Sequence, residues 1–195
     1  MYSTVMTSML CGIRAIPVQV EVDISTGLPA FEMVGYLSSE VREAKERVRT
    51  ALHNCGVSLP AKRITINLSP GNVRKTGTGF DLPIAVALLS AIGVLDEMCS
   101  RQKVFVGELN LSGQLLPVNG ILPVVSDGCR DGVHTDFIIP MDNLAEGELV
   151  RDASVYGFSS LEAVIAYLRG GAYEKPALTM LSAESVSGVD FAEVN

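Results

Sequence analysis

The feature that most constrains the fold is a helix without a polar face. Residues 84–89 (IAVALL) are all apolar. A helix that is apolar all round must be covered by other elements on every side. Asp81 is the expected N-cap, and Pro83 falls in the first turn, where its missing N–H is not needed. We therefore expect a helix over Asp81–Ile92 at the centre of a folded domain.

The segment before this helix supplies a strand and a tight loop. Arg63–Leu68 alternates apolar and polar residues and is rich in β-branched types, which predicts a strand. Ser69–Phe80 contains Gly71, Gly77 and Gly79, and glycine allows a chain to turn sharply. The sequence therefore predicts a strand, a tight loop and a buried helix in succession.

The rest of the chain supplies elements that can cover the buried helix. Hydrophobic periodicity predicts further strands at Val5–Leu10, Arg14–Ile24, Ala30–Val34, Lys103–Leu109, Gln114–Val118, Asp136–Pro140 and Ser154–Phe158. It predicts helices from Ser38 or Ser39 to Cys55, over Ile121–Arg130 and over Ser160–Arg169, with one or two helical turns in Leu144–Val150. This order indicates an α+β domain, a mixed sheet with helices packed on it. We expect the domain over residues 1–170 and a linker over 171–195, where periodicity is weak.

Composition fits a folded, soluble domain, with 48% apolar and 19% charged residues. No apolar run approaches the roughly 18–20 residues that a membrane span requires, and residues 1–10 do not resemble a signal peptide. The four cysteines are far apart, which favours reduced thiols and a cytoplasmic protein. The histidines, His53 and His134, have no ligand-spaced partners, so we expect no metal site.

Positive charge is concentrated in one part of an acidic chain. The formal net charge is −7, but residues 42–75 hold eight basic and two acidic residues. If these side chains converge, they would contact DNA phosphates or a neighbouring subunit. The alternative is a solvated face with internal pairs such as Glu43–Arg47 and Arg42–Glu46. The candidate contact residues are Arg42, Lys45, Arg49, Lys62, Arg63, Arg74 and Lys75.

The glycine-rich loop does not have the pattern of a phosphate-binding P-loop. That motif needs a Lys directly after its second glycine, and neither Gly77 nor Gly79 is followed by one. We therefore expect a tight turn here and no cofactor bound by this part of the chain.

Several short motifs resemble one family of bacterial proteins. They are Gly27-Leu28-Pro29-Ala30-Phe31, Val34-Gly35, Glu46–Leu52, Pro60–Pro70 and Lys75–Ala85. In this order they resemble the N-terminal domain of the Mg-chelatase-like, competence-protein ComM type of AAA+ ATPase, over residues 1 to about 170. The resemblance implies a fold like the Lon proteolytic domain. It also implies a hexameric, ATP- and Mg²⁺-dependent DNA motor, with helicase or branch-migration activity in natural transformation. Residues 171–195 would lead to its ATPase module, which is absent from this chain.

The same resemblance implies a domain without catalysis of its own. Lon-type proteases use a Ser–Lys pair, and the corresponding positions here are Gly79 and Leu122. Neither residue can serve as nucleophile or base. Another pair, such as Ser69 with Lys75, stays open as an alternative. A small-molecule kinase of the same broad fold is a further alternative, although GTGFDLP lacks the serines of its phosphate loop.

Overall fold

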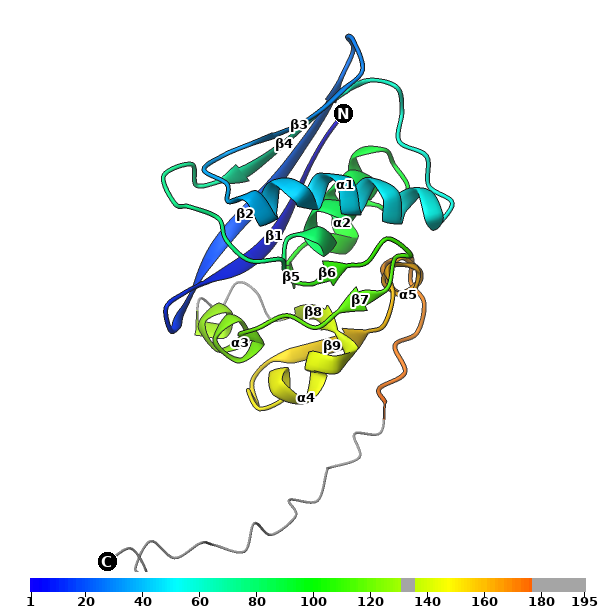
Figure 1. Ribbon diagram of the computed structural model, residues 1–195. Helices are drawn as coiled ribbons and strands as arrows, with labels where there is room; N and C mark the ends of the chain where they lie inside the picture. Colours follow the sequence, from blue (N-terminus) through cyan, green and yellow to red (C-terminus); the bar gives the residue numbers. More distant parts are fainter. Residues whose placement is uncertain (131–135, 177–195) are drawn as a thin grey trace, which may run out of the picture.

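The computed structural model describes residues 1–130 and 136–176, which form a mixed sheet with helices on both faces (Figure 1). The sheet has seven strands in the order β3-β4-β2-β1-β5-β8-β9. Their bounds are β1 Tyr2–Cys11, β2 Arg14–Ser25, β3 Ala30–Val34, β4 Arg63–Ser69, β5 Lys103–Phe105, β8 Asp136–Pro140 and β9 Ser154–Phe158. Strands β2 and β1 and strands β2 and β4 pair antiparallel, and the other neighbours pair parallel. The expected α+β architecture is confirmed.

The helices follow the predicted order closely. They are α1 Ser39–Asn54, α2 Asp81–Ala91, α3 Ile121–Arg130, α4 Leu144–Gly147 and α5 Leu161–Leu168, with 3₁₀ turns η1 Glu97–Ser100 and η2 Met141–Asn143. Strands β6 Glu108–Leu109 and β7 Leu115–Leu116 form a separate two-stranded sheet.

Helix α2 lies between α1 and the long strands β1 and β2, as its sequence predicts (Figure 1). All its residues except Ser90 are buried. The strands turn alternate side chains toward it, including Val5, Val20 and Ile66. The Ser3 hydroxyl donates a hydrogen bond of 2.6 Å to the carbonyl of Ala87, so β1 also contacts the helix through a polar group. Apolar burial on this scale is the main force that stabilises the domain.

The second face of the sheet is covered where the strands are parallel. In β8, Phe137 and Ile139 pack against α3 residues on this face, while Ile138 faces the α2 side. The strand is therefore buried on both faces, as is typical of parallel sheets.

Asp81 does not cap α2, so the N-cap prediction was wrong. The N-cap position is Phe80, and the buried Asp81 carboxylate turns toward α1 and β6. It accepts hydrogen bonds from Arg47 Nε (2.7 Å), Arg47 Nη2 (3.0 Å) and the Leu109 N–H (3.0 Å). Burial raises the pKa of the Asp81 carboxyl, and these hydrogen bonds oppose that rise. One carboxylate therefore joins three elements of the fold.

The single strand predicted over Lys103–Leu109 was wrong, because the chain leaves the main sheet after Phe105. Gly107 donates to the Gly79 carbonyl and accepts from the Leu82 N–H, both at 3.0 Å. A Cβ at Gly107 would lie 2.9 Å from Leu115 Cδ2, so any other residue here would require the Leu115 side chain to move. The segment splits into β5 and β6 because it must pass the start of α2.

Packing continues beyond Gly170. The Tyr173 ring packs against Tyr156, Phe158 and Tyr167, and its hydroxyl accepts a 3.0 Å hydrogen bond from the Gly157 N–H. The division into a domain and a linker stays a prediction, and residues 177–195 lie outside the described residues.

The Arg47–Asp81 contact predicts a large effect of one conservative change. Asp81→Asn removes the buried partner of Arg47 and leaves it with the exposed Glu43, and breaking such a buried pair costs about 3–5 kcal/mol. We expect urea unfolding to show a loss of that size. Glu43→Gln is the matched control, because Glu43 is exposed and lies 3.9 Å from the same Arg47. It should cost less than about 1 kcal/mol.

If Asp81→Asn does not fold, the double variant Arg47→Met/Asp81→Leu removes both charges and should restore folding. Equal losses for Asp81→Asn and Glu43→Gln would contradict the assignment of a special role to this pair.

Candidate nucleic-acid interface

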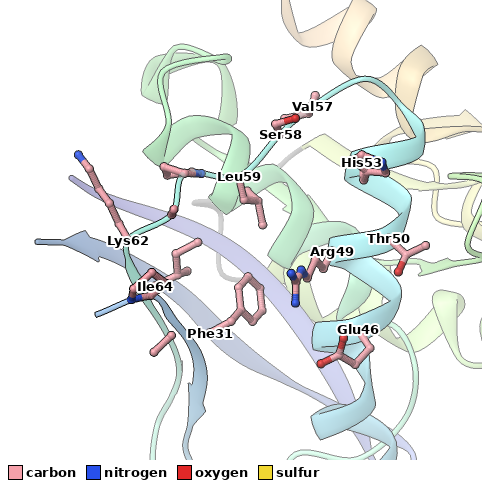
Figure 2. Close-up of a pocket in the computed structure, with 14 residues that line it drawn as sticks. Phe31, Glu46, Arg49, Thr50, His53, Val57, Ser58, Leu59, Lys62 and Ile64 are labelled. Atoms are coloured by element: carbon pink, nitrogen blue, oxygen red, sulfur yellow. The ribbon is translucent and has the colours of Figure 1, made fainter. Parts of the chain in front are cut away.

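Two grooves lie along α1, and the first separates the helix from the edge strand β3 (Figure 2). This groove, the α1 groove, has a volume of about 710 Å³. Arg49 reaches from α1 toward Phe31 of β3, and Lys62 extends outward from the loop before β4 (Figure 2). His53 and Glu46 stand on the helix side of the same groove.

The second groove lies at the beginning of α1, and we call it the Tyr36 groove. Its volume is about 680 Å³, and it is lined by Tyr36, Arg42, Glu43 and Arg74 among others. The Arg74 guanidinium carbon lies 5.9 Å from the centre of the Tyr36 ring, which is cation–π distance. Arg42 and Arg49 are two helical turns apart, so both grooves open on one face of α1.

The predicted basic residues fall into two groups. Arg42, Arg49, Lys62 and Arg74 are exposed, and none of them forms an ion pair within residues 1–130 and 136–176. Others are paired: Lys45 Nζ lies 3.7 Å from Glu46, and Arg63 Nη2 lies 2.8 Å from Glu32. Of the two pairs expected for a solvated face, Glu43–Arg47 forms at 3.9 Å and Arg42–Glu46 does not. Four exposed cations therefore remain for an anionic partner.

Lys75 has to be removed from the predicted contact set, because its side chain is fully buried. Its Nζ donates a hydrogen bond to the carbonyl of Pro70, and burial lowers the pKa of the amine. The Lys75 N–H donates a 2.8 Å hydrogen bond to the Tyr36 carbonyl, and the Lys75 carbonyl accepts a 3.0 Å hydrogen bond from the Ser38 N–H. Lys75 thus fixes its loop to the start of α1 and contributes no charge to the surface.

Tyr36 was missed from the sequence. Tyr36 lies outside the basic segment 42–75, which it precedes by six residues. Tyr36 is 55% exposed although it lies between a turn and the buried Leu37, and this exposure is what marks it as a candidate contact residue. Sequence periodicity does not report exposure in such a short connection.

Gly79 lies in a small cleft of about 180 Å³ at the start of α2. Val106, Asn119 and Ser8 line the same cleft. A Cβ at Gly79 would lie 2.9 Å from Val106 Cγ1, so a serine does not fit without a shift of that side chain. At the position expected to correspond to a Lon-type nucleophile, a side chain would therefore have to displace Val106.

The corresponding lysine position also lacks a base. Leu122 is in the first turn of α3, where its N–H donates a 2.9 Å hydrogen bond to Glu146 Oε1. The alternative pair of Ser69 and Lys75 is not assembled, because the Lys75 ammonium bonds to the Pro70 carbonyl. No Ser–Lys hydrogen bond is present within the described part of the chain.

Residues 1–130 and 136–176 contain no group of three or more His, Cys, Asp or Glu side chains that could hold a metal ion. His53 is exposed in the α1 groove, and His134 lies outside the described residues. In the same described part, no helix has the length and apolar character needed to cross a membrane.

Comparison with known proteins gives the family. Residues 20–143 match the model of a family described as subunit ChlI of Mg-chelatase. The chain is 41% identical over 159 residues to competence protein ComM of Haemophilus influenzae, a match that covers 82% of this chain and 31% of that protein. It is 41% identical over 175 residues to protein YifB of Escherichia coli, covering 89% of this chain and 34% of the relative.

A more distant match is Lon protease 1 of Bacillus subtilis, with 29% identity over 131 residues, 64% of this chain and 16% of that protein. It agrees with a Lon-like fold. The chain spans about a third of the length of ComM and YifB. With the family model matching well over half of the sequence, the chain belongs to the Mg-chelatase-like family that includes competence protein ComM.

Proposed function

We propose that this domain is a non-catalytic accessory module of a longer AAA+ ATPase, and that its α1 face binds nucleic-acid phosphates. The single observation that carries the proposal is the set of four exposed cations along the two grooves that form no ion pair within residues 1–130 and 136–176. Phosphate contacts by Lys and Arg supply most of the affinity in sequence-independent binding. The rest of the chain is acidic and would repel the nucleic acid, which would favour binding on this face.

In the longer protein we infer that ATP and Mg²⁺ act in a separate ATPase module, and that the assembly is a cytoplasmic hexamer that moves DNA, as a helicase or in branch migration during natural transformation. The family supports ATPase chemistry of the AAA+ type. The part of this domain would be to guide DNA toward that motor. A contact of the same face with a neighbouring subunit is the competing proposal, and it predicts oligomers instead of retained DNA.

The surroundings of Gly79 and Lys75 support the non-catalytic part of the proposal. A nucleophilic side chain at Gly79 would require Val106 to move, and the Lys75 amine is held inside the fold. The peptidase alternative would need a nucleophile and a base in this cleft, and the kinase alternative would need the serines of a phosphate loop.

Nucleic-acid retention should be strong at low salt and fall steeply as salt rises. Four phosphate contacts on duplex DNA predict a slope of log affinity against log salt of about −3.6. The variant Arg49→Gln/Lys62→Gln should reduce the slope by about 2 in fluorescence anisotropy. Arg101→Gln/Arg151→Gln removes two exposed charges elsewhere and should leave the slope nearly unchanged.

Absence of retention at low salt would remove the nucleic-acid proposal. Equal losses in both double variants would show a general charge effect and no defined face. Sedimentation of the wild-type chain in the same buffer separates these results from subunit association.

The chain should neither bind ATP nor cleave peptides. Calorimetric titration with ATP and Mg²⁺ should give no saturable heat, because no lysine follows Gly77 or Gly79. A fluorogenic-peptide assay should give the same background for the wild type and for Ser69→Ala. Peptide turnover abolished by Ser69→Ala would overturn the non-catalytic proposal.

A further inference from the structure

Tyr36 is an exposed aromatic side chain in a groove with two arginines that form no ion pair in the described part of the chain. Its exposed fraction is 55%, and it lines the Tyr36 groove together with Arg42 and Arg74. Most large aromatic side chains in this fold pack on one another or in the core, as Tyr156, Tyr167 and Tyr173 do. An exposed ring in a groove that also holds two guanidinium groups suits a ligand that has both a flat face and negative charge.

The backbone on both sides of the Tyr36 ring is held in place. The Tyr36 carbonyl accepts a 2.8 Å hydrogen bond from the Lys75 N–H, and Leu37 is buried. Before the ring, Gly35 has φ +130°, and a Cβ there would lie 3.1 Å from the Leu68 carbonyl oxygen. A ring on a fixed backbone loses little conformational entropy when a ligand stacks on it.

The side chains of residues 74 and 75 point in opposite directions, which places Arg74 next to this ring. The Lys75 side chain enters the interior and bonds to the Pro70 carbonyl, so Arg74 turns outward. Its guanidinium lies 5.9 Å from the ring centre. Glu43 also lines the groove, but it lies 3.9 Å from Arg47, which offsets its charge.

We propose that the Tyr36 groove binds unpaired nucleotides of a single-stranded nucleic acid. One base stacks on the Tyr36 ring, and the flanking phosphates pair with Arg42 and Arg74. This inference rests on the proposed nucleic-acid function and adds a preference for single strands at one end of α1. The bases of a duplex are stacked on one another, so only an unpaired base can offer a free face to the ring.

The test compares single-stranded and duplex binding in the 195-residue chain. Fluorescence anisotropy is measured with a labelled oligothymidine of about 16 nucleotides and with a duplex of the same length. For Tyr36→Ala we expect a loss of about 5- to 150-fold in single-strand affinity, the range for loss of one stacked base. Duplex affinity should change less than about twofold, and Tyr36→Phe should keep single-strand binding because it keeps the ring.

The matched control is Tyr2→Ala. Tyr2 is similarly exposed, at 59%, but its hydroxyl contacts Thr4 on β1 and Glu21 on β2. It should leave both affinities unchanged. The salt slope separates stacking from charge: Tyr36→Ala should not change it, and Arg74→Gln should reduce it by about 0.7 for single strands.

The outcomes distinguish the two proposals. If the wild type retains both nucleic acids and Tyr36→Ala binds single strands as well as the wild type does, the stacking site is overturned and the phosphate-binding face stands. An equal loss for single strands and duplex also overturns it. If neither nucleic acid is retained at low salt, both proposals fail. Urea unfolding of each variant confirms that the exposed substitutions leave the fold intact.

Discussion

The buried ion pair between Arg47 and Asp81 fixes the orientation of α1 and so of the face that carries the two grooves. A carboxylate inside an apolar core is stable only with a hydrogen-bonded counter-charge. Arg47 provides it through two bonds of 2.7 and 3.0 Å, so α1 has to lie against the start of α2. Position 42 is about 140° around the helix from position 47, and position 49 shares the face of position 42. Turning Arg47 inward therefore turns Arg42 and Arg49 toward the grooves.

A second buried charge organises the loop before α2. Lys75 lies inside and bonds to Pro70, while its backbone bonds to residues on both sides of Leu37. Hydrogen bonds thereby join the loop to the connection before α1, and the joined surface carries Tyr36 and Arg74. Burial of the Lys75 amine therefore accompanies the arrangement of Tyr36 and Arg74 in the Tyr36 groove.

Much of the fold could be predicted because its signals are local. Strands β3, β8 and β9 and helix α3 have the predicted bounds, since hydrophobic periodicity and turn residues define them. Asp81 as an N-cap and Lys103–Leu109 as one strand were wrong for one reason. Both follow local rules, and both are overridden where Arg47, Gly107 and the start of α2 come together.

By itself the sequence determined a buried helix, a mixed sheet around it and a basic segment in an acidic chain, because composition and periodicity are properties of short stretches. Only the tertiary structure decided which charges are available. Lys75 and Arg74 are neighbours in sequence, yet one is fully buried and the other exposed. Tyr36 joins the basic residues only through the pairing of Leu37 with Lys75. Exposure and proximity depend on contacts between distant segments, and no local pattern encodes them.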